Sequence, residues 1–117
     1  MQAEPKPRRI HRRDPGSLLQ KQLQKLSGEQ ASVTLERERP WASITFSGTR
    51  YSFTVRCADK QAPDTLPQLA RTLPEYEFAL PGYFVADILV TEQSAAQLRI
   101  EVLSIIDPVQ SPRTGEA

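Results

Sequence analysis

The chain has few of the residue types on which common enzyme sites depend. Its 117 residues include one cysteine, Cys57, and one histidine, His11. A lone cysteine excludes a disulfide framework within the chain and is typical of a reducing compartment, so we expect a cytoplasmic protein. His11 lies in an N-terminal segment with little to bury, where no second shell can hold it as a base or metal ligand. We therefore expect no catalytic histidine, no metal and no cofactor.

Long apolar runs and sequence motifs for phosphate or metal are also missing. No apolar stretch approaches the roughly 20 residues of a membrane-spanning helix, and no apolar segment follows the basic N-terminus as in a secretory signal. The five glycines form no phosphate-binding loop, and neither HExxH nor CxxC occurs. These absences favour a non-enzymatic protein.

Positive charge is concentrated at the N-terminus. The first 14 residues hold five basic and two acidic side chains, whereas the remainder holds ten basic and twelve acidic ones. The basic residues of this arm are Lys6, Arg8, Arg9, Arg12 and Arg13. We expect residues 1–13 to be a disordered basic arm, residues 14–107 to form a single domain, and residues 108–117 to be a disordered tail.

Two segments have the pattern of amphipathic helices. Over residues 15–27, leucines recur at i, i+4 and i+7, Asp14 and Pro15 provide a helix start, and Gly28 provides an end. Residues 65–73 contain a second, shorter apolar face that stops at a proline. The leucine stripes predict that both helices pack on a sheet.

A period of two begins at Ala31 and predicts strands. We expect strands over residues 31–39, 41–47 and 50–57, with a loop at Pro40 and a tight type II′ turn at Gly48.

Two further strands, over residues 82–93 and 97–107, close the chain as a hairpin. The fold class is therefore α+β: a small two-layer domain with an antiparallel sheet of about five strands. The predicted order is α-β-β-β-α-β-β, with two helices packed on one face and no internal repeat.

The strand over residues 83–90 is apolar on both faces apart from Asp87, so both faces need cover. Two short helices leave part of that surface for a partner. The sequence therefore predicts a small interaction module whose partner is a protein, either a second copy of the chain or another chain.

The principal alternative is binding of nucleic acid. In the predicted hairpin, Trp41, Arg50 and Arg56 share the outer face, and Trp41 lies opposite Arg56, where the two side chains can make a cation–π contact. The basic arm would add weak, non-specific and salt-sensitive attraction to phosphates. A solvated sheet face and a solubilising tail explain the same residues without any ligand.

A second alternative is a small enzyme. Asp87 and Glu101 are predicted to share one face of the last hairpin, opposite or diagonal to each other, and paired carboxylates can divide acid and base roles. A solvated face, or pairing of Asp87 with Arg99, is the simpler interpretation.

Overall fold

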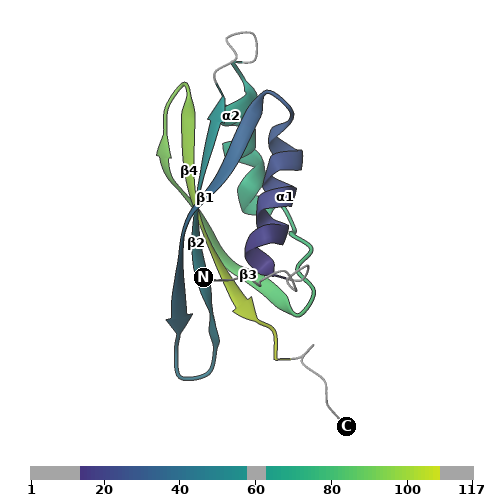
Figure 1. The fold of residues 1–117 in the computed structure, drawn as a ribbon, viewed down its shortest axis with the longest axis vertical. Coiled ribbons are helices and arrows are strands. Elements are labelled where there is room, and N and C mark those ends of the chain that lie inside the picture. The colour runs from purple at the N-terminus through teal and green to yellow at the C-terminus, as the bar shows by residue number, and fades with distance from the viewer. Residues whose placement is uncertain (1–13, 58–62, 109–117) are drawn as a thin grey trace, which may run out of the picture.

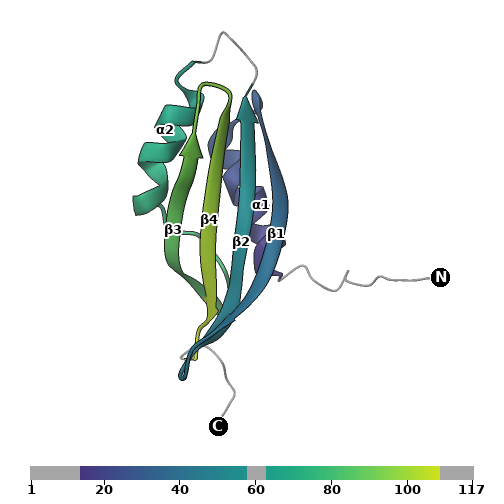
Figure 2. The same ribbon diagram turned by 90° about the vertical axis from the view of Figure 1, so that its left-hand side faces the viewer.

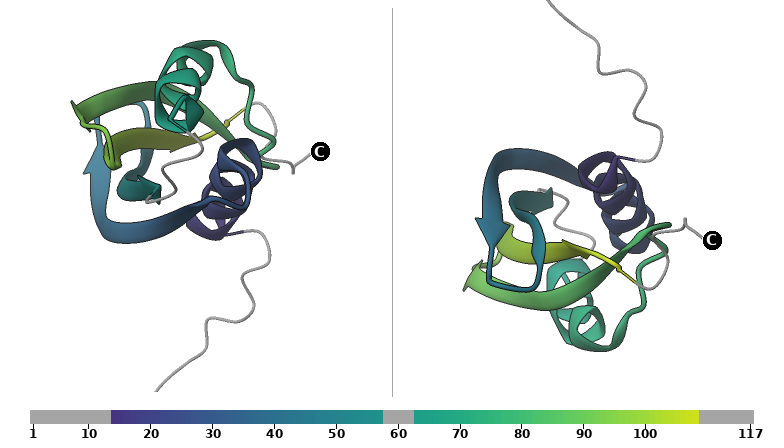
Figure 3. Two further views of the ribbon diagram at one scale, coloured as in Figure 1. Left: turned by 90° about the horizontal axis from the view of Figure 1, so that it is seen from above. Right: turned by 90° about the horizontal axis from the view of Figure 1, so that it is seen from below.

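The computed structural model describes residues 14–57 and 63–108. Its elements are α1 (Pro15–Ser27), β1 (Ala31–Ala42), β2 (Ser47–Cys57), α2 (Thr65–Thr72), the 3-10 turn η2 (Leu73–Glu75), β3 (Tyr83–Gln93) and β4 (Gln97–Ile106). The strands form one antiparallel sheet in the order β1-β2-β4-β3. Both helices lie on one side of this sheet (Figure 1, Figure 3). The chain is therefore an α+β domain of two layers, as predicted.

The helices begin and end where the sequence places them. Asp14 occupies the N-cap of α1, although its carboxylate accepts a hydrogen bond from the Ser17 hydroxyl (3.2 Å) rather than from the backbone. Gly28 ends the helix with a φ of 86°, a conformation that favours glycine. The predicted arm, residues 1–13, and nearly all of the predicted tail, residues 109–117, lie outside the described residues.

The prediction of three strands before α2 is wrong. One long hairpin, β1 and β2, replaces them, so the sheet has four strands and the order is α-β-β-α-β-β. Pro40 lies inside β1, where it pairs with Thr49. Because β1 is an edge strand, the missing N–H of a proline interrupts no ladder with another strand.

The hairpin turns at residues 43–46 and not at Gly48. The Ser43 N–H donates to the Phe46 carbonyl (2.8 Å), and the Ser43 hydroxyl accepts from the Phe46 N–H (3.1 Å). Gly48 instead lies within β2, where a Cβ atom would overlap the Ser104 carbonyl oxygen and come within 2.9 Å of the Ile105 Cα. Glycine is required there for close approach of β2 and β4, which explains why it resembles a turn residue in the sequence.

A bulge at Glu36 changes which side chains face the helices. Leu35 pairs with Phe53, whereas Arg37 pairs with Ser52, so β1 carries one extra residue between them. A bulge moves the following residues to the opposite face. Arg37 and Arg39 therefore face away from the helices, whereas simple alternation would place them toward the core.

The main core lies between the helices and the sheet. α1 contributes Leu19 and Leu23, and the strands contribute side chains at alternate positions. The buried members are Leu19, Leu23, Ala31, Val33, Tyr51, Phe53, Val55, Cys57, Leu66, Leu69, Leu73, Leu80, Leu98, Ile100 and Val102. Cys57 is a small buried hydrophobe of this core, consistent with its position in the sequence.

The fold consists of two units of the same design. Each unit is a helix followed by a hairpin, and the second strands, β2 and β4, pair at the centre of the sheet. The second turn repeats the first: the Ser94 N–H donates to the Gln97 carbonyl (2.8 Å), and the Ser94 hydroxyl accepts from the Gln97 N–H (3.2 Å). The two turns lie at opposite ends of the sheet (Figure 1). The fold therefore repeats, although the sequence does not.

Both edges of the sheet carry features that oppose pairing with another strand. Along β1, the Gln24 side chain bonds the Ala31 carbonyl (2.8 Å) and the Val33 N–H (3.1 Å), and Gln20 bonds the Val33 carbonyl (2.9 Å). Along β3, the register shifts at residue 86 and again at residue 91. Bulges and covered backbone groups are common protections of edge strands.

Within the described residues, no helix is long and apolar enough to cross a membrane.

Replacement of Gly48 by alanine is expected to destabilise the domain. The new methyl group must displace the β4 backbone, and overpacking of this kind costs about 1–3 kcal/mol. Urea denaturation measures the free energy of unfolding, with the exposed neighbour Ser47→Ala as the matched control. Equal stability of the two variants would contradict the close approach of β2 and β4.

Stability is also expected to fall at high pH because of Tyr51. The pKa of Tyr51 is raised from 10 to about 12, chiefly by burial of the phenol; a hydrogen bond with Thr49 lowers it, and the charges of Asp14 and Glu38 raise it. Between pH 10 and 12 the unfolded chain releases a proton that the folded chain retains. The free energy of unfolding therefore decreases across this range, by about 2 kcal/mol. Denaturation across the range should show a shallower decrease for Tyr51→Phe, and an identical decrease would contradict this assignment.

Candidate functional site

The face of the sheet that points away from α1 and α2 is here called the open face. No described helix covers it, and Figure 2 shows it toward the viewer with α1 behind the strands. It consists of the side chains that alternate with those of the main core. The register of the strands arranges these side chains in rows that run across all four strands.

The row nearest the first turn is apolar. Trp41 of β1 pairs with Gly48 of β2, Gly48 pairs with Ile105 of β4, and Ile105 pairs with Phe84 of β3. The Phe46 ring, from the turn, contacts the Phe84 ring edge-on, with 6.3 Å between centroids. Edge-to-face contacts of this kind are favourable. The first turn thus reaches across the end of β4 to β3.

A small second core lies on the open face. Leu103 and Ile105 are only 6% and 4% exposed, yet neither belongs to the core beneath the helices. Around them Phe46 and Phe84 are each 38% exposed, and Leu89 is 46% exposed. This grouping of exposed side chains over buried ones is the apolar patch of the open face.

The next row carries charge at both ends. Arg39 of β1 pairs with Arg50, Arg50 with Leu103, and Leu103 with Asp87 of β3. Arg50 also forms an ion pair with Glu101 (3.9 Å). Neither Arg39 nor Asp87 forms an ion pair with any residue in the described ranges.

The charges of the open face divide between its two halves. Arg37, Arg39, Arg50 and Arg56 lie on β1 and β2, together with Glu36 at the bulge. On β3 the charged side chains are Asp87 and Glu92, and Glu92 pairs with Arg99 of β4 (3.3 Å). The half of the open face formed by β1 and β2 is therefore basic, and the margin along β3 is acidic.

A polar depression of about 270 Å³ lies further along the open face, lined by Thr54, Arg37, Arg99 and neighbouring residues. Thr54 is 1% exposed, and its hydroxyl has no hydrogen-bond partner among the described residues. Burial of an unpaired hydroxyl costs about 1–3 kcal/mol. The depression is small, and both acidic and basic groups line it.

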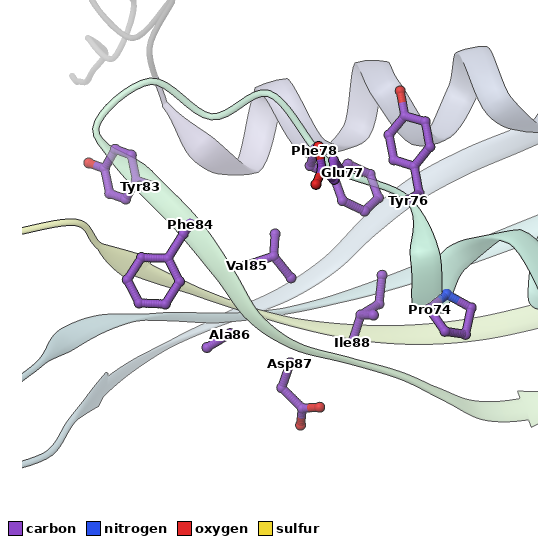
Figure 4. Close-up of a pocket in the computed structure, with 10 residues that line it drawn as sticks. All are labelled: Pro74, Tyr76, Glu77, Phe78, Tyr83, Phe84, Val85, Ala86, Asp87 and Ile88. Carbon is purple, nitrogen blue, oxygen red and sulfur yellow. The ribbon is translucent and has the colours of Figure 1, made fainter. Parts of the chain in front are cut away.

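A larger groove, of about 520 Å³, follows the outer edge of β3. Tyr76 and Phe78 lie on its helix side, whereas Phe84 and Asp87 point to the other side of the strand (Figure 4). The groove therefore meets the open face at Phe84 and Asp87. It extends the apolar patch around the edge of the sheet.

The structure places Trp41 and Arg50 in adjacent rows of one face, whereas Arg56 lies at the other end of β2. Trp41, Arg50 and Arg56 all lie on the open face. However, Trp41 lies opposite Gly48 and Arg56 opposite Ser32, so the expected contact between Trp41 and Arg56 is wrong. The eight-residue offset along β2 separates their positions by about 26 Å. The five basic residues of the arm lie outside the described residues.

The predicted carboxylate pair, Asp87 on β3 and Glu101 on β4, lies at diagonal positions of the last hairpin. Asp87 pairs with Leu103 and Glu101 with Leu89, both on the open face. The ion-pair partner of Glu101 is Arg50, and that of Arg99 is Glu92 rather than Asp87. Within the described part of the chain, no cluster of three His, Cys, Asp or Glu side chains could hold a metal ion.

Sequence reasoning missed most of the apolar patch. Phe46, Phe84, Leu103 and Ile105 come from three separate segments, and only the register brings them together. The available signal was the two-sided apolar character of residues 83–90. No family model, curated protein or solved structure matches this chain.

Proposed function

We propose that the protein is a non-enzymatic module that binds a protein partner, either a second copy of the chain or another chain, through the open face of its sheet. The observation that supports this most directly is the apolar patch, in which Phe46, Phe84 and Leu89 remain exposed around buried Leu103 and Ile105. Ile44, at the tip of the adjacent turn, is also fully exposed. Contiguous exposed apolar surface of this kind is typical of interaction sites.

The residues around the patch have the composition of protein interfaces. Trp41 and several arginines border it, and aromatic residues and arginine are enriched at interfaces and among their strongest contacts. Because both edges of the sheet are protected against strand addition, the open face is the main uncovered surface of the sheet.

The same groups offer little for catalysis. Glu101 is engaged by Arg50, and the single cysteine is buried in the core. We place the module in the cytoplasm because one cysteine fits a reducing compartment.

A photo-cross-linking amino acid in place of Leu89, introduced into the full chain in its native cells, tests this function. We expect a covalent protein adduct from this position and none when the same group replaces Arg71, which is exposed on α2. Phe84→Ser should remove the adduct by reducing the apolar patch. A Leu89 position that gives no protein adduct in the otherwise unchanged chain, or an adduct that persists in Phe84→Ser, would refute the proposal.

Nucleic-acid binding is a second candidate, favoured by the grouping of Trp41 with Arg37, Arg39 and Arg50 on β1 and β2. The acidic margin on β3 and the ion pair of Arg50 with Glu101 oppose it. This candidate predicts salt-sensitive retention of the full chain on single-stranded DNA or RNA.

Retention should then fall several-fold in Trp41→Ala and in Arg39→Gln, whereas Arg71→Gln on α2 should behave as the wild type. Retention unchanged by the first two substitutions would exclude the open face as a nucleic-acid site.

A further inference from the structure

The order of the charges across the open face indicates which kind of surface would be complementary to it. Across one row, the side chains are Arg39, Arg50, Leu103 and Asp87, from β1 to β3. The two ends of this row carry opposite charges, and neither end is neutralised within the described residues. A partner surface complementary to the row must carry an acidic group at one end and a basic group at the other.

A second copy of the chain meets this requirement in one orientation. Rotation by 180° about an axis parallel to the strands, between β2 and β4, places β1 of one copy over β3 of the other. Arg39 then faces Asp87 of the second copy, and Asp87 faces its Arg39. Such a contact is isologous, so each favourable pair occurs twice. We propose that the protein self-associates through its open face in this arrangement.

The apolar row fits the same rotation. Trp41 of one copy lies over Phe84 of the other, and Gly48, which has no side chain, lies over Ile105. Aromatic pairs are favourable beyond their buried area. The rotation thus places Ile105 over the open position left by Gly48 and Arg39 over Asp87.

The alternative two-fold arrangement is unfavourable. An axis in the plane of the face but across the strands places β1 over β1 of the second copy. Arg37 and Arg39 of one copy then approach the same arginines of the other. Like charges across an interface cost several kcal/mol in this setting, so the order of charges selects one orientation.

Pairing through strand edges is opposed by the structure. The Gln20 and Gln24 side chains form hydrogen bonds with backbone groups of β1, and Pro40 removes one backbone N–H donor from that strand. Two bulges distort β3. Face-to-face packing meets none of these obstacles. Packed sheets lie about 10 Å apart, a distance that an arginine and an aspartate side chain span together.

The size of the face indicates a reversible dimer. Four strands of 10–12 residues, at about 4.8 Å between strands and about 3.3 Å per residue, present on the order of 600 Å² per copy. Two copies would bury about 1,200 Å², the lower limit of standard specific interfaces. We therefore expect the fraction of dimer to depend on protein concentration.

Charge reversal in the full chain tests the arrangement by analytical ultracentrifugation over about a hundredfold range of concentration. The wild type should pass from monomer to dimer, and Arg39→Asp or Asp87→Arg alone should raise the dimer dissociation constant at least about tenfold. An equal mixture of the two variants should dimerise again, because each new charge then faces its opposite. Arg71→Asp, on α2, should dimerise as the wild type does.

Three results would overturn the proposal: a wild type that stays monomeric throughout, reversals that leave the dimer unchanged, or a mixture that does not recover. A second measurement covers the case in which a reversal impairs folding. Arg37 and Leu89 are the ends of the next row, so Arg37→Cys chains mixed with Leu89→Cys chains should be joined by a short bismaleimide. Arg71→Cys mixed with Leu89→Cys should not, and the opposite pattern would exclude this orientation.

Self-association rests on the proposed function because both use the open face, but the two can fail separately. A monomeric wild type whose Leu89 position cross-links to a protein of another mass contradicts the dimer and leaves the binding function intact. A monomeric wild type without any protein adduct from the open face contradicts both.

Discussion

The placement of both helices on one face of a four-stranded sheet is the constraint on which the rest of the structure depends. α1 and α2 pack on one face of the strands, over side chains at alternate positions, and so create the main core. The same placement leaves the opposite face without a helix. On that face Leu103 and Ile105 are buried by side chains of the sheet and its first turn. The first turn supplies part of that cover when Phe46 reaches Phe84. Phe46, Phe84 and Leu89 remain partly exposed around Leu103 and Ile105 and form the apolar patch with them.

The two helix–hairpin units contribute different charges to the open face. Each unit is a helix and a hairpin closed by a serine, yet the first contributes arginines to the open face and the second contributes its acidic margin. Because the two helix–hairpin units carry different charges, the row that begins with Arg39 on β1 ends with Asp87 on β3. This inequality underlies the proposed orientation of the dimer, in which Arg39 faces Asp87 of the second copy.

Local patterns predicted the elements whose signals are local. The bounds of α1 follow from its leucine spacing and from Asp14 and Gly28, and the last hairpin follows from two largely apolar segments separated by a short loop. The first hairpin could not be predicted in this way because Gly48 has a role set by β4, which lies some fifty residues further along the chain. Nothing in the local alternation reveals that Glu36 forms a bulge, although that bulge decides that Arg37 and Arg39 face outward. The candidate site is therefore a product of register, which depends on non-local pairing.

The most direct test of self-association through the open face is a series of amide NMR spectra of the full chain at increasing protein concentration. We expect concentration-dependent shifts that include Trp41, Arg39, Phe84 and Asp87, with little change along α1 and α2. Shifts concentrated on the exposed surfaces of the helices, or spectra that do not change with concentration, would contradict self-association through this face.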